Sequence, residues 1–451
     1  MFKLFAGLAL CVACSVSNAA LKIQSWTLDN GARVLFVENH SIPILDLSVT
    51  FDAGARRDPA GKSGTAAMTM AMLARGIQKG NAEQGKESSE PALSEAQISD
   101  QFADTAAQRG GNLDDDKASM NLRTLISERA TSVPLFARLL AQPSFPADLL
   151  ARDKARSIAD IKESLTRPEA IASRAFAKQL YGTHPYAIQP TVTSIDAITR
   201  DDLVAFHATH YVANHAVIAM IGDISREQAQ QIAEQLTQGL SQGATLPTLP
   251  PVPHLKSEEE RIPHPASQAH ILIGMPGYAR HDPDHFALTV GNYILGGGGF
   301  VSRLTQQVRV KRGLTYGVFS YFDPMLQAGP FQISLQTQKA QADQALQVVR
   351  TTVADFLRDG PTEAEVQAAK DNLIGGFALR IDNNRKILAN IASIGFYDLP
   401  LDYLDTWTQR IAQVSVADVK AAFNRKVQMD HLSTVMVGGD VAGNVSEKTA
   451  P

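Results

Sequence analysis

The sequence repeats itself with a period of about half its length, and this repeat limits the chain to a duplicated architecture. The segment ITRDDLVAFHATHYVANHAVIAMIGDIS at 198–225 aligns with VSVADVKAAFNRKVQMDHLSTVMVGGDV at 414–441. In this alignment Asp202 of the first copy matches Asp418 of the second. A repeat of this length predicts two copies of one domain and excludes a solenoid of short units.

Each copy is expected to contain a strand, a helix, further strands, a helix pair, and then a helix and a closing strand. The runs HAVIAMIGDI (215–224) and GPFQISLQTQ (329–338) suit a mainly antiparallel sheet. The predicted fold class is therefore α+β, with helices packed on one face of each sheet. A chain of 451 residues with 44% apolar residues can bury more than one core.

A proline-rich stretch marks the expected joint between the copies. The sequence LPTLPPVPHLKSEEERIPHPAS (246–267) disfavours both a helix interior and a central strand, because proline lacks an amide N–H. We therefore expect an N-terminal domain at 20–243, a linker at 244–263 and a C-terminal domain at 264–446.

The N-terminus has the pattern of a secretory signal. Lys3 is followed by an apolar stretch that ends at Val16 and by small residues, so cleavage is expected near Ala19, with 1–19 as the signal peptide. The mature chain is then exported to the periplasm, with no later segment apolar enough to span a membrane. A lipid anchor on Cys14 is the alternative.

Two bulk properties exclude whole classes of function. Cys11 and Cys14 are the only cysteines and both precede the expected cleavage point, which leaves the mature chain without disulfides or thiolate ligands. Acidic residues number 46 and basic residues 42, with no long block of either sign. This balance does not favour nucleic acid as a partner.

Three motifs follow one another along the chain. GARRDPAGKSGTAAMTMAMLARG (54–76) follows an alternating strand, YGTHPYAIQPTVTSIDAITRDDLVAFHATHY begins at 181, and LGGGGFVSRLTQQVRVKRGLTYGVFSYF spans 295–322. Together they resemble the M16 family of zinc peptidases (insulinase, pitrilysin, mitochondrial processing peptidase), in its two-domain bacterial M16B form. The resemblance implies two homologous LuxS/MPP-like metallohydrolase domains.

The resemblance also shows what this chain lacks. The family's zinc motif is His-x-x-Glu-His on the first helix, where two imidazoles one turn apart share the metal and the glutamate is the general base. Those places fall on Ala67, Met70 and Ala71, and the family's downstream glutamate ligand falls on Asp160. One carboxylate cannot hold zinc alone, so we expect no metal in this chain and zinc in a partner subunit.

Other potential metal ligands are less convincing. Three groups contain such side chains: His281 with His285, His207 with His210, and the thioethers of Met68, Met70 and Met72. Pro283 interrupts the first pair at a helix start. We expect the second pair to be surface or capping histidines, and the methionines to fill the core because alternate helical positions diverge.

The third motif keeps the family's other functional element. An arginine and a tyrosine seven residues apart reach the substrate at the zinc site, and the resemblance places them at Arg309 and Tyr316. A guanidinium can bind a peptide carbonyl or carboxylate, and a phenol can donate to a developing oxyanion. The alternative is that Arg309 faces solvent and Tyr316 packs at a strand start.

A run of four glycines precedes this pair. Gly296, Gly297, Gly298 and Gly299 lack the Lys-Ser/Thr of a phosphate loop, so nucleotide binding is not expected. Residues without Cβ let the backbone approach an extended peptide closely. The run resembles the glycine-rich loop of the zinc-free subunit of mitochondrial processing peptidase.

These features predict the zinc-free subunit of a heterodimeric periplasmic peptidase. Arg309 and Tyr316 would complete the active site of a zinc-bearing M16 homologue, and an unfolded or short peptide would be held extended against a sheet edge. The alternative is a non-hydrolytic peptide-binding, chaperone or scaffold module with the same fold. A third hypothesis, an active zinc peptidase, conflicts with Ala67, Met70 and Ala71.

Overall fold

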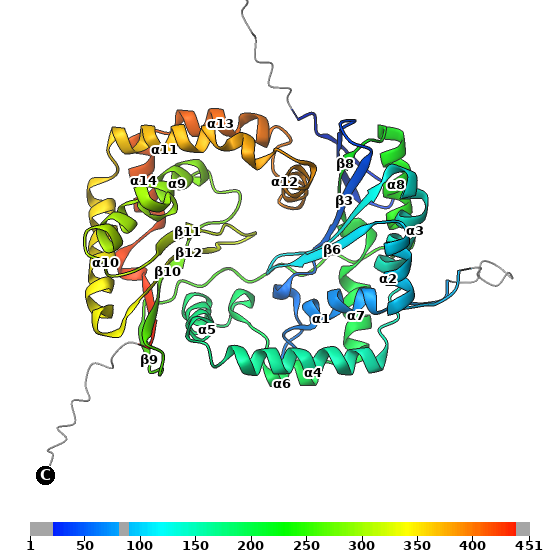
Figure 1. The fold of residues 1–451 in the computed structure, drawn as a ribbon, viewed down its shortest axis with the longest axis horizontal. Coiled ribbons are helices and arrows are strands. Elements are labelled where there is room, and N and C mark those ends of the chain that lie inside the picture. The colour runs from blue at the N-terminus through cyan, green and yellow to red at the C-terminus, as the bar shows by residue number, and fades with distance from the viewer. Residues whose placement is uncertain (1–20, 81–89, 439–451) are drawn as a thin grey trace, which may run out of the picture.

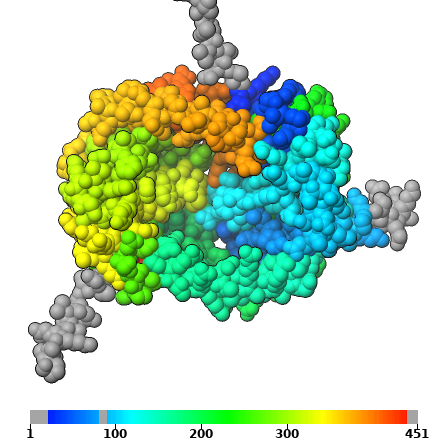
Figure 2. Space-filling view, viewed as in Figure 1, coloured from blue at the N-terminus to red at the C-terminus, as the bar shows by residue number. Residues whose placement is uncertain are grey.

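The computed structural model describes residues 21–80 and 90–438. The expected signal peptide with Cys11 and Cys14, the polar segment 81–89 and the residues after 438 lie outside this part of the chain. The two halves face each other across a central space (Figure 1), and the space-filling view shows a hollow there (Figure 2).

Two sheets form the framework. The order of the second sheet, read from β9 to β11, repeats the order of the first sheet read from β2 to β6. The first has the order β1-β2-β8-β3-β7-β6, with strands Gln24–Thr27, Arg33–Glu38, Val217–Gly222, Ile44–Phe51, Ala118–Leu125 and Gln108–Leu113. The second has the order β11-β12-β10-β13-β9, with strands Val318–Phe322, Pro330–Gln338, Gln268–Pro276, Ser433–Val437 and Glu259–Ile262. Among the described strands, only β2 with β8 and β13 with β9 pair in parallel. The predicted α+β class with mainly antiparallel sheets is confirmed.

The helices follow the same repeat. The first half holds α1 Thr65–Met72, α2 Glu95–Asp104, α3 Arg129–Ala141, α4 Ala147–Ser164, α5 Pro168–Tyr181, α6 Val192–Ala197, α7 Arg200–His210 and α8 Arg226–Thr237. The second holds α9 His285–Asn292, α10 Ala342–Asp359, α11 Glu363–Gly375, α12 Asn384–Phe396, α13 Tyr403–Gln413 and α14 Val416–Lys426. A short hairpin, β4 Gly76–Ile77 and β5 Leu93–Ser94, completes the described elements.

The matched aspartates of the sequence repeat have one structural role. Asp202 and Asp418 each occupy the third position of a helix, α7 and α14, whose N-cap is Thr199 or Ser415. In both helices the hydroxyl accepts from the aspartate's backbone N–H, and the carboxylate accepts from the backbone N–H of the cap residue. This reciprocal capping satisfies two amide groups that the first helical turn leaves free. The repeat therefore preserves a helix start.

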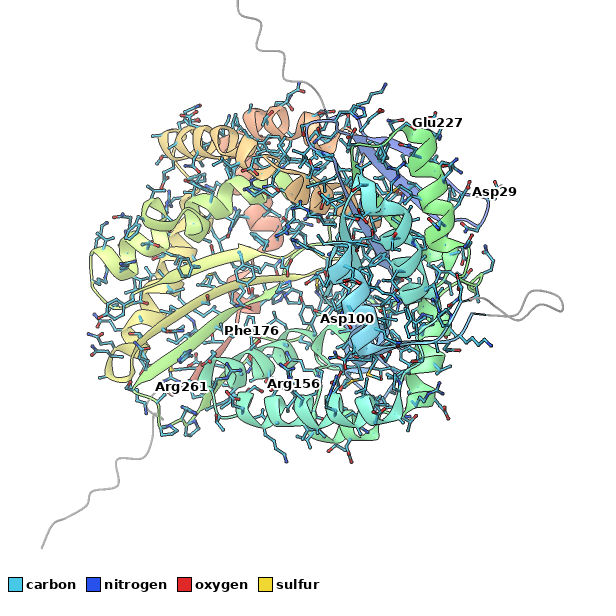
Figure 3. The ribbon with its side chains drawn as sticks, turned by 45° about the vertical axis from the view of Figure 1, so that its right-hand side comes forward. Asp29, Asp100, Arg156, Phe176, Glu227 and Arg261 are labelled. Atoms are coloured by element: carbon cyan, nitrogen blue, oxygen red, sulfur yellow. The ribbon has the colours of Figure 1, made fainter. Side chains whose placement is uncertain are left out.

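Each half contributes one helix that packs against the sheet of the other half. Helix α5 packs against β10 and β13, and Phe176 lies beneath the second sheet (Figure 3), where its ring approaches Gly274. Helix α12 packs against β8, β3 and β2 of the first sheet. Its Ile387, Leu388 and Ile391 form an apolar cluster there with Val37, Ala219 and Ile221. Both faces of each sheet thus carry helices, which extends the expected one-sided arrangement.

The segment between the halves crosses without regular structure at 241–258 and then forms β9, an edge strand. This agrees with the expectation that its prolines exclude a helix or a central strand. The domain limits 20–243, 244–263 and 264–446 remain predictions. In the described part of the chain, no helix combines the length and the apolar character needed to cross a membrane.

A buried carboxylate on the turn between β6 and β7 ties the halves together. Asp116 accepts hydrogen bonds from the hydroxyl of Tyr186 at 2.7 Å, the hydroxyl of Tyr397 at 3.1 Å and the backbone N–H of Leu326 at 2.7 Å. The guanidinium of Arg56 lies 3.1 Å from the same carboxylate. Tyr397 and Leu326 belong to the second half, so this Asp116 cluster joins both halves through one charged group.

The neighbouring Asp115 gives a prediction about pH. Burial raises its pKa to about 6, and the charges of Asp116, Asp114 and Asp323 act in the same direction. The native state then binds this proton more tightly than the unfolded state, whose value is 3.8. The ionised carboxylate therefore costs stability above pH 6, and that cost disappears as the pH falls from 6 towards 4.

We expect Asp115→Asn to raise the free energy of unfolding by about 1–2 kcal/mol at pH 7.5 and to flatten its pH dependence between 6 and 4. Urea titrations at four pH values measure both effects. Asp100→Asn, on the exposed face of α2 (Figure 3), is the control and should leave the profile unchanged. A variant less stable than the parent at pH 7.5 would contradict the assignment.

Candidate functional site

Helix α1 sits where the zinc helix is expected, and its start is firmly fixed. Gly64 adopts φ +102°, a left-handed conformation that favours glycine. The carboxylate of Asp58 accepts from the backbone N–H groups of Gly64 at 2.6 Å and Ala66 at 2.7 Å. These bonds satisfy amide groups at the positive end of the helix. The architecture of the family's first helix is therefore intact.

The outer face of α1 presents methyl and thioether groups. Ala67 and Ala71 are exposed, and Met70 is half-buried with its methyl group over Gly111 of β6. Met68 and Met72 are buried in the core, as expected of core-filling side chains. The three sulfurs therefore do not converge on one point.

The acidic residues of α4 do not supply a metal site either. Asp160 is exposed and forms no hydrogen bond or ion pair with any described residue. Asp153, two turns earlier, is buried and lies 2.8 Å from Arg75 and 3.0 Å from Arg152. Zinc needs three or four nitrogen, sulfur or oxygen ligands. The residues at the family's zinc position do not fit the metal.

The histidine pairs have structural partners. His207 and His210 contact the carbonyl oxygens of Leu140 at 2.7 Å and Asp52 at 3.0 Å, and burial lowers the pKa of both. Of the expected surface or capping positions, a surface position was wrong for His210, which is buried, while the half-buried His207 contacts a carbonyl in the last turn of α3, as a capping residue does. His285 lies 3.0 Å from two tyrosine hydroxyls, and burial lowers its pKa to about 4. Among the described residues, no group of three or more His, Cys, Asp or Glu could hold a metal ion.

Arg309 and Tyr316 are placed in the second half and both are available to a ligand. Arg309 lies in a π-helical turn, Thr305–Val310, with its guanidinium 4.7 Å from the centre of the Phe300 ring. It has no carboxylate partner in the described chain. Tyr316 precedes β11, and 85% of its surface is exposed, with no hydrogen bond from its hydroxyl to another described residue. Tyr316 is therefore not the packed residue of the alternative interpretation.

The glycine run follows α9 and adjoins Arg309 through Phe300. A Cβ at Gly296 would come within 2.4 Å of Ser320 on β11, and one at Gly298 within 2.6 Å of the Tyr293 carbonyl oxygen. Gly299 has φ +61°. Local packing thus requires glycine at 296 and 298, and the left-handed backbone favours it at 299. Their expected contact with substrate stays a prediction.

Sequence reasoning missed the most accessible strand edge. The residues of β6 read QRGGNL, and nearly all are exposed, because β6 pairs with β7 on one side only. Its second edge pairs with no other described strand, so the N–H and C=O groups there can pair with another extended chain. The glycine pair Gly110 and Gly111 within this strand was the available signal.

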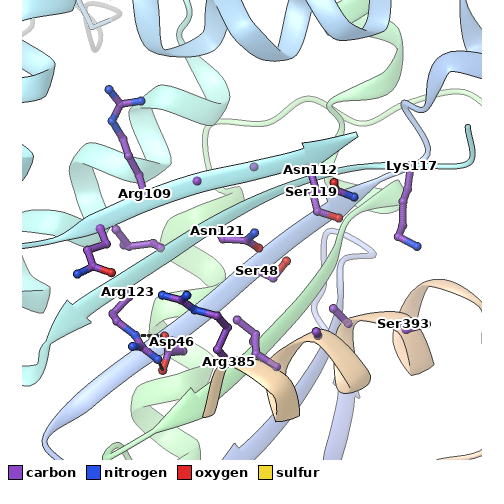
Figure 4. Close-up of a pocket in the computed structure, with 17 residues that line it drawn as sticks. Asp46, Ser48, Arg109, Asn112, Lys117, Ser119, Asn121, Arg123, Arg385 and Ser393 are labelled. Carbon is purple, nitrogen blue, oxygen red and sulfur yellow. Dashed lines mark hydrogen bonds and ion pairs between the residues drawn. The ribbon is translucent and has the colours of Figure 1, made fainter. Parts of the chain in front are cut away.

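Beside β6 lies a cavity of about 460 Å³ between the first sheet and α12 (Figure 4). The strands contribute polar side chains, and Arg385 enters from the first turn of α12. Arg109 points away from the other labelled side chains in this view, towards Phe102. Sequence reasoning missed this cavity as well, since its two walls come from opposite halves of the chain.

Comparisons with known proteins agree with this description. A model of the peptidase M16 inactive domain matches residues 197–373. A crystal structure of a peptidase M16 inactive domain from Pseudomonas fluorescens shares 38% identity with a TM-score of 0.86, over 94% of this chain and 99% of that chain.

Two curated relatives are more distant. The non-peptidase homolog YmxG of Helicobacter pylori is 23% identical over 410 residues, which are 90% of this chain and 91% of that protein. An uncharacterised zinc protease of Streptomyces coelicolor is 29% identical over 255 residues, so this chain spans only 55% of that relative's length. The intact fold, the absence of metal ligands on α1 and the match to the Pseudomonas fluorescens structure lead to one conclusion: the chain belongs to the peptidase M16 family, as a non-catalytic member of the inactive-domain type.

Proposed function

We propose that this chain is the zinc-free subunit of a heterodimeric M16 peptidase. A zinc-bearing homologue is the partner and supplies the metal, the attacking water and the general base. The observation that carries the proposal is the contrast between the two halves. Arg309 and Tyr316 have no hydrogen-bond or ion-pair partner for their side chains among the described residues, whereas Ala67, Met70 and Ala71 offer nothing to a metal. Such a chain holds one part of an active site.

In this proposal Arg309 and Tyr316 act on the peptide at the partner's metal. The guanidinium of Arg309 binds a peptide carbonyl or carboxylate. The hydroxyl of Tyr316 donates a hydrogen bond to the oxyanion that forms during hydrolysis. The glycines at 296–299 allow the adjoining backbone to approach the same peptide.

The free edge of β6 supports an extended peptide as the substrate. A peptide that pairs with this edge gains main-chain hydrogen bonds that are independent of its sequence. Unfolded or short peptides can adopt this conformation, whereas folded domains rarely offer a free strand. The position of Met70 over Gly111 places β6 directly beside the former zinc helix.

Exposed apolar side chains near Arg309 support a protein partner at this surface. Phe300 is 64% exposed and Val301 is 70% exposed, and Val310 is also exposed. Adjacent apolar side chains of this size are typical of surfaces that another protein covers. The N-terminal pattern of a signal peptide favours the periplasm as the compartment in which the pair works.

A second candidate function is a peptide-binding module without hydrolysis, acting as a chaperone or scaffold. The free edge of β6 and the cavity beside it favour this candidate, because both serve binding and neither requires a metal. The two functions differ in what the chain does once it is paired.

The test is to purify the mature chain alone and together with a zinc-bearing M16 homologue from the same cell. We expect no stoichiometric zinc and no turnover of a quenched peptide by the chain alone, and hydrolysis by the pair beyond that of the homologue. Elemental analysis and fluorescence measure both. A fully occupied zinc and turnover in the isolated chain would overturn the proposal. Peptide binding without stimulation of the homologue would favour the module.

A further inference from the structure

The face of the first sheet opposite α1 changes from apolar to polar as it nears β6. Where α12 covers it, the sheet presents valine, alanine and isoleucine. Beyond α12, the paired positions Asp46↔Arg123 and Ser48↔Asn121 lie on this same face. These polar side chains are unusual, because a sheet face that is covered by helices is normally apolar. The polar side chains line the 460 Å³ cavity described above.

Three of the groups in this cavity have no partner in the described chain. They are the guanidinium of Arg385, the carboxamide of Asn121 and the hydroxyl of Ser48, whose residue is only 3% exposed. Buried polar groups in native proteins are almost always hydrogen-bonded. The Ser48 hydroxyl lies at the cavity wall, where a ligand or ordered solvent can supply the partner that the described chain does not.

The charges in the cavity favour an anion. The carboxylate of Asp46 is already held by Arg123, at 2.6 Å and 3.0 Å. Lys117 lies 3.4 Å from Asp114. Arg109 and Arg385 also line the cavity without an ion-pair partner among the described residues; Arg109 points towards Phe102, whereas Arg385 lies beside the Asp46–Arg123 pair (Figure 4). A guanidinium with an amide and a hydroxyl nearby is a suitable donor set for one carboxylate.

A route leads from the strand edge into the cavity. Gly110 of β6 pairs with Asn121, and a Cβ at Gly110 would meet no atom within 4 Å. A peptide strand added to β6 would lie about 4.8 Å away. Every second side chain of that strand would face the cavity, and the one opposite Gly110 could pass over the glycine towards Asn121.

We propose that this cavity is the subsite for one glutamate side chain of the peptide bound along β6, with Arg385 as the residue that determines the preference. The proposal rests on the peptide-binding function above and names its substrate class: extended peptides with an acidic residue at a cavity-facing position. Arg385 belongs to α12, so a residue of the second half binds the side chain of a peptide whose backbone pairs with β6 of the first half.

The experiment uses two fluorescein-labelled decapeptides of alanine, serine and threonine that differ only in a central glutamate or glutamine. Both have blocked termini and the same label, so the central glutamate is the only charge that differs between them. Fluorescence anisotropy measures Kd for the full mature chain. We expect the glutamate peptide to bind about tenfold more tightly, since a charge-assisted hydrogen bond has about this effect.

Arg385→Gln should abolish this preference and leave the Kd of the glutamine peptide unchanged. Ala389→Glu, which adds a carboxylate to the cavity wall, should also abolish it. Arg156→Gln is the matched control, because Arg156 is exposed on α4 (Figure 3) without a described partner. Equal binding of both peptides by the parent chain, or an undiminished preference in Arg385→Gln, would overturn the subsite alone. Failure of both peptides to bind would overturn the peptide-binding function and the subsite with it.

Discussion

Replacement of Arg309 by alanine in the reconstituted pair is expected to lower kcat/KM for peptide hydrolysis by about 10²–10³-fold, and Tyr316→Phe should lower kcat to a similar extent. Each variant removes a group that stabilises charge on the reacting peptide. Neither should change the free energy of unfolding of this chain by more than about 0.5 kcal/mol, because neither side chain forms an internal hydrogen bond or ion pair among the described residues. Steady-state kinetics with a quenched peptide and urea titrations measure the two effects.

Arg312→Ala is the control for this experiment. Arg312 lies three residues beyond Arg309, and its guanidinium donates only to Gln307. We expect it to leave kcat/KM within about twofold of the parent pair. If Arg309→Ala and Tyr316→Phe retained full activity, the zinc-bearing partner would have to contain a complete site of its own.

The second large effect concerns Asp116, whose loss should destabilise the whole chain. Asp116→Ala removes one carboxylate partner of Arg56, whose side chain is only 2% exposed. It also leaves the hydroxyls of Tyr186 and Tyr397 without this acceptor. Removal of one member of a buried charged network costs about 3–5 kcal/mol. Calorimetry and urea unfolding should show this loss, together with a lower Tm.

Asp160→Asn is the matched control for Asp116→Ala. Its carboxylate is exposed and has no described partner, so the change should stay within about 0.5 kcal/mol. A loss below about 1 kcal/mol in Asp116→Ala would show that the halves are held together by apolar packing alone.

The local features of the fold could be predicted from the sequence, because they depend on neighbouring residues. Thr199 and Asp202 stand three positions apart and define a helix start, and the same pattern recurs at Ser415 and Asp418. The lack of metal ligands at Ala67 and Ala71 could also be predicted, because the residue type alone shows whether a side chain can bind a metal.

Features that join distant segments could not be predicted in this way. The apolar pattern of α5 and α12 indicates which face of each helix is buried. It does not indicate that this face packs against the sheet of the other half. The cavity was hidden for the same reason: Arg385 lies more than two hundred residues from Asn121 in the chain. The buried position of His210 was misjudged because its acceptor is a backbone carbonyl, which no side-chain pattern reveals.

The exchange of α5 and α12 restricts how this molecule can move. Separation of the two halves would pull Phe176 away from Gly274 and bare Val37, Ala219 and Ile221 to water at the same time. Helices α5 and α12 therefore both restrict bending at the proline-rich crossing, one on each side of the central hollow. The chain should move as one rigid body, so in the proposed heterodimer any gap that admits a peptide would have to open at the boundary with the partner.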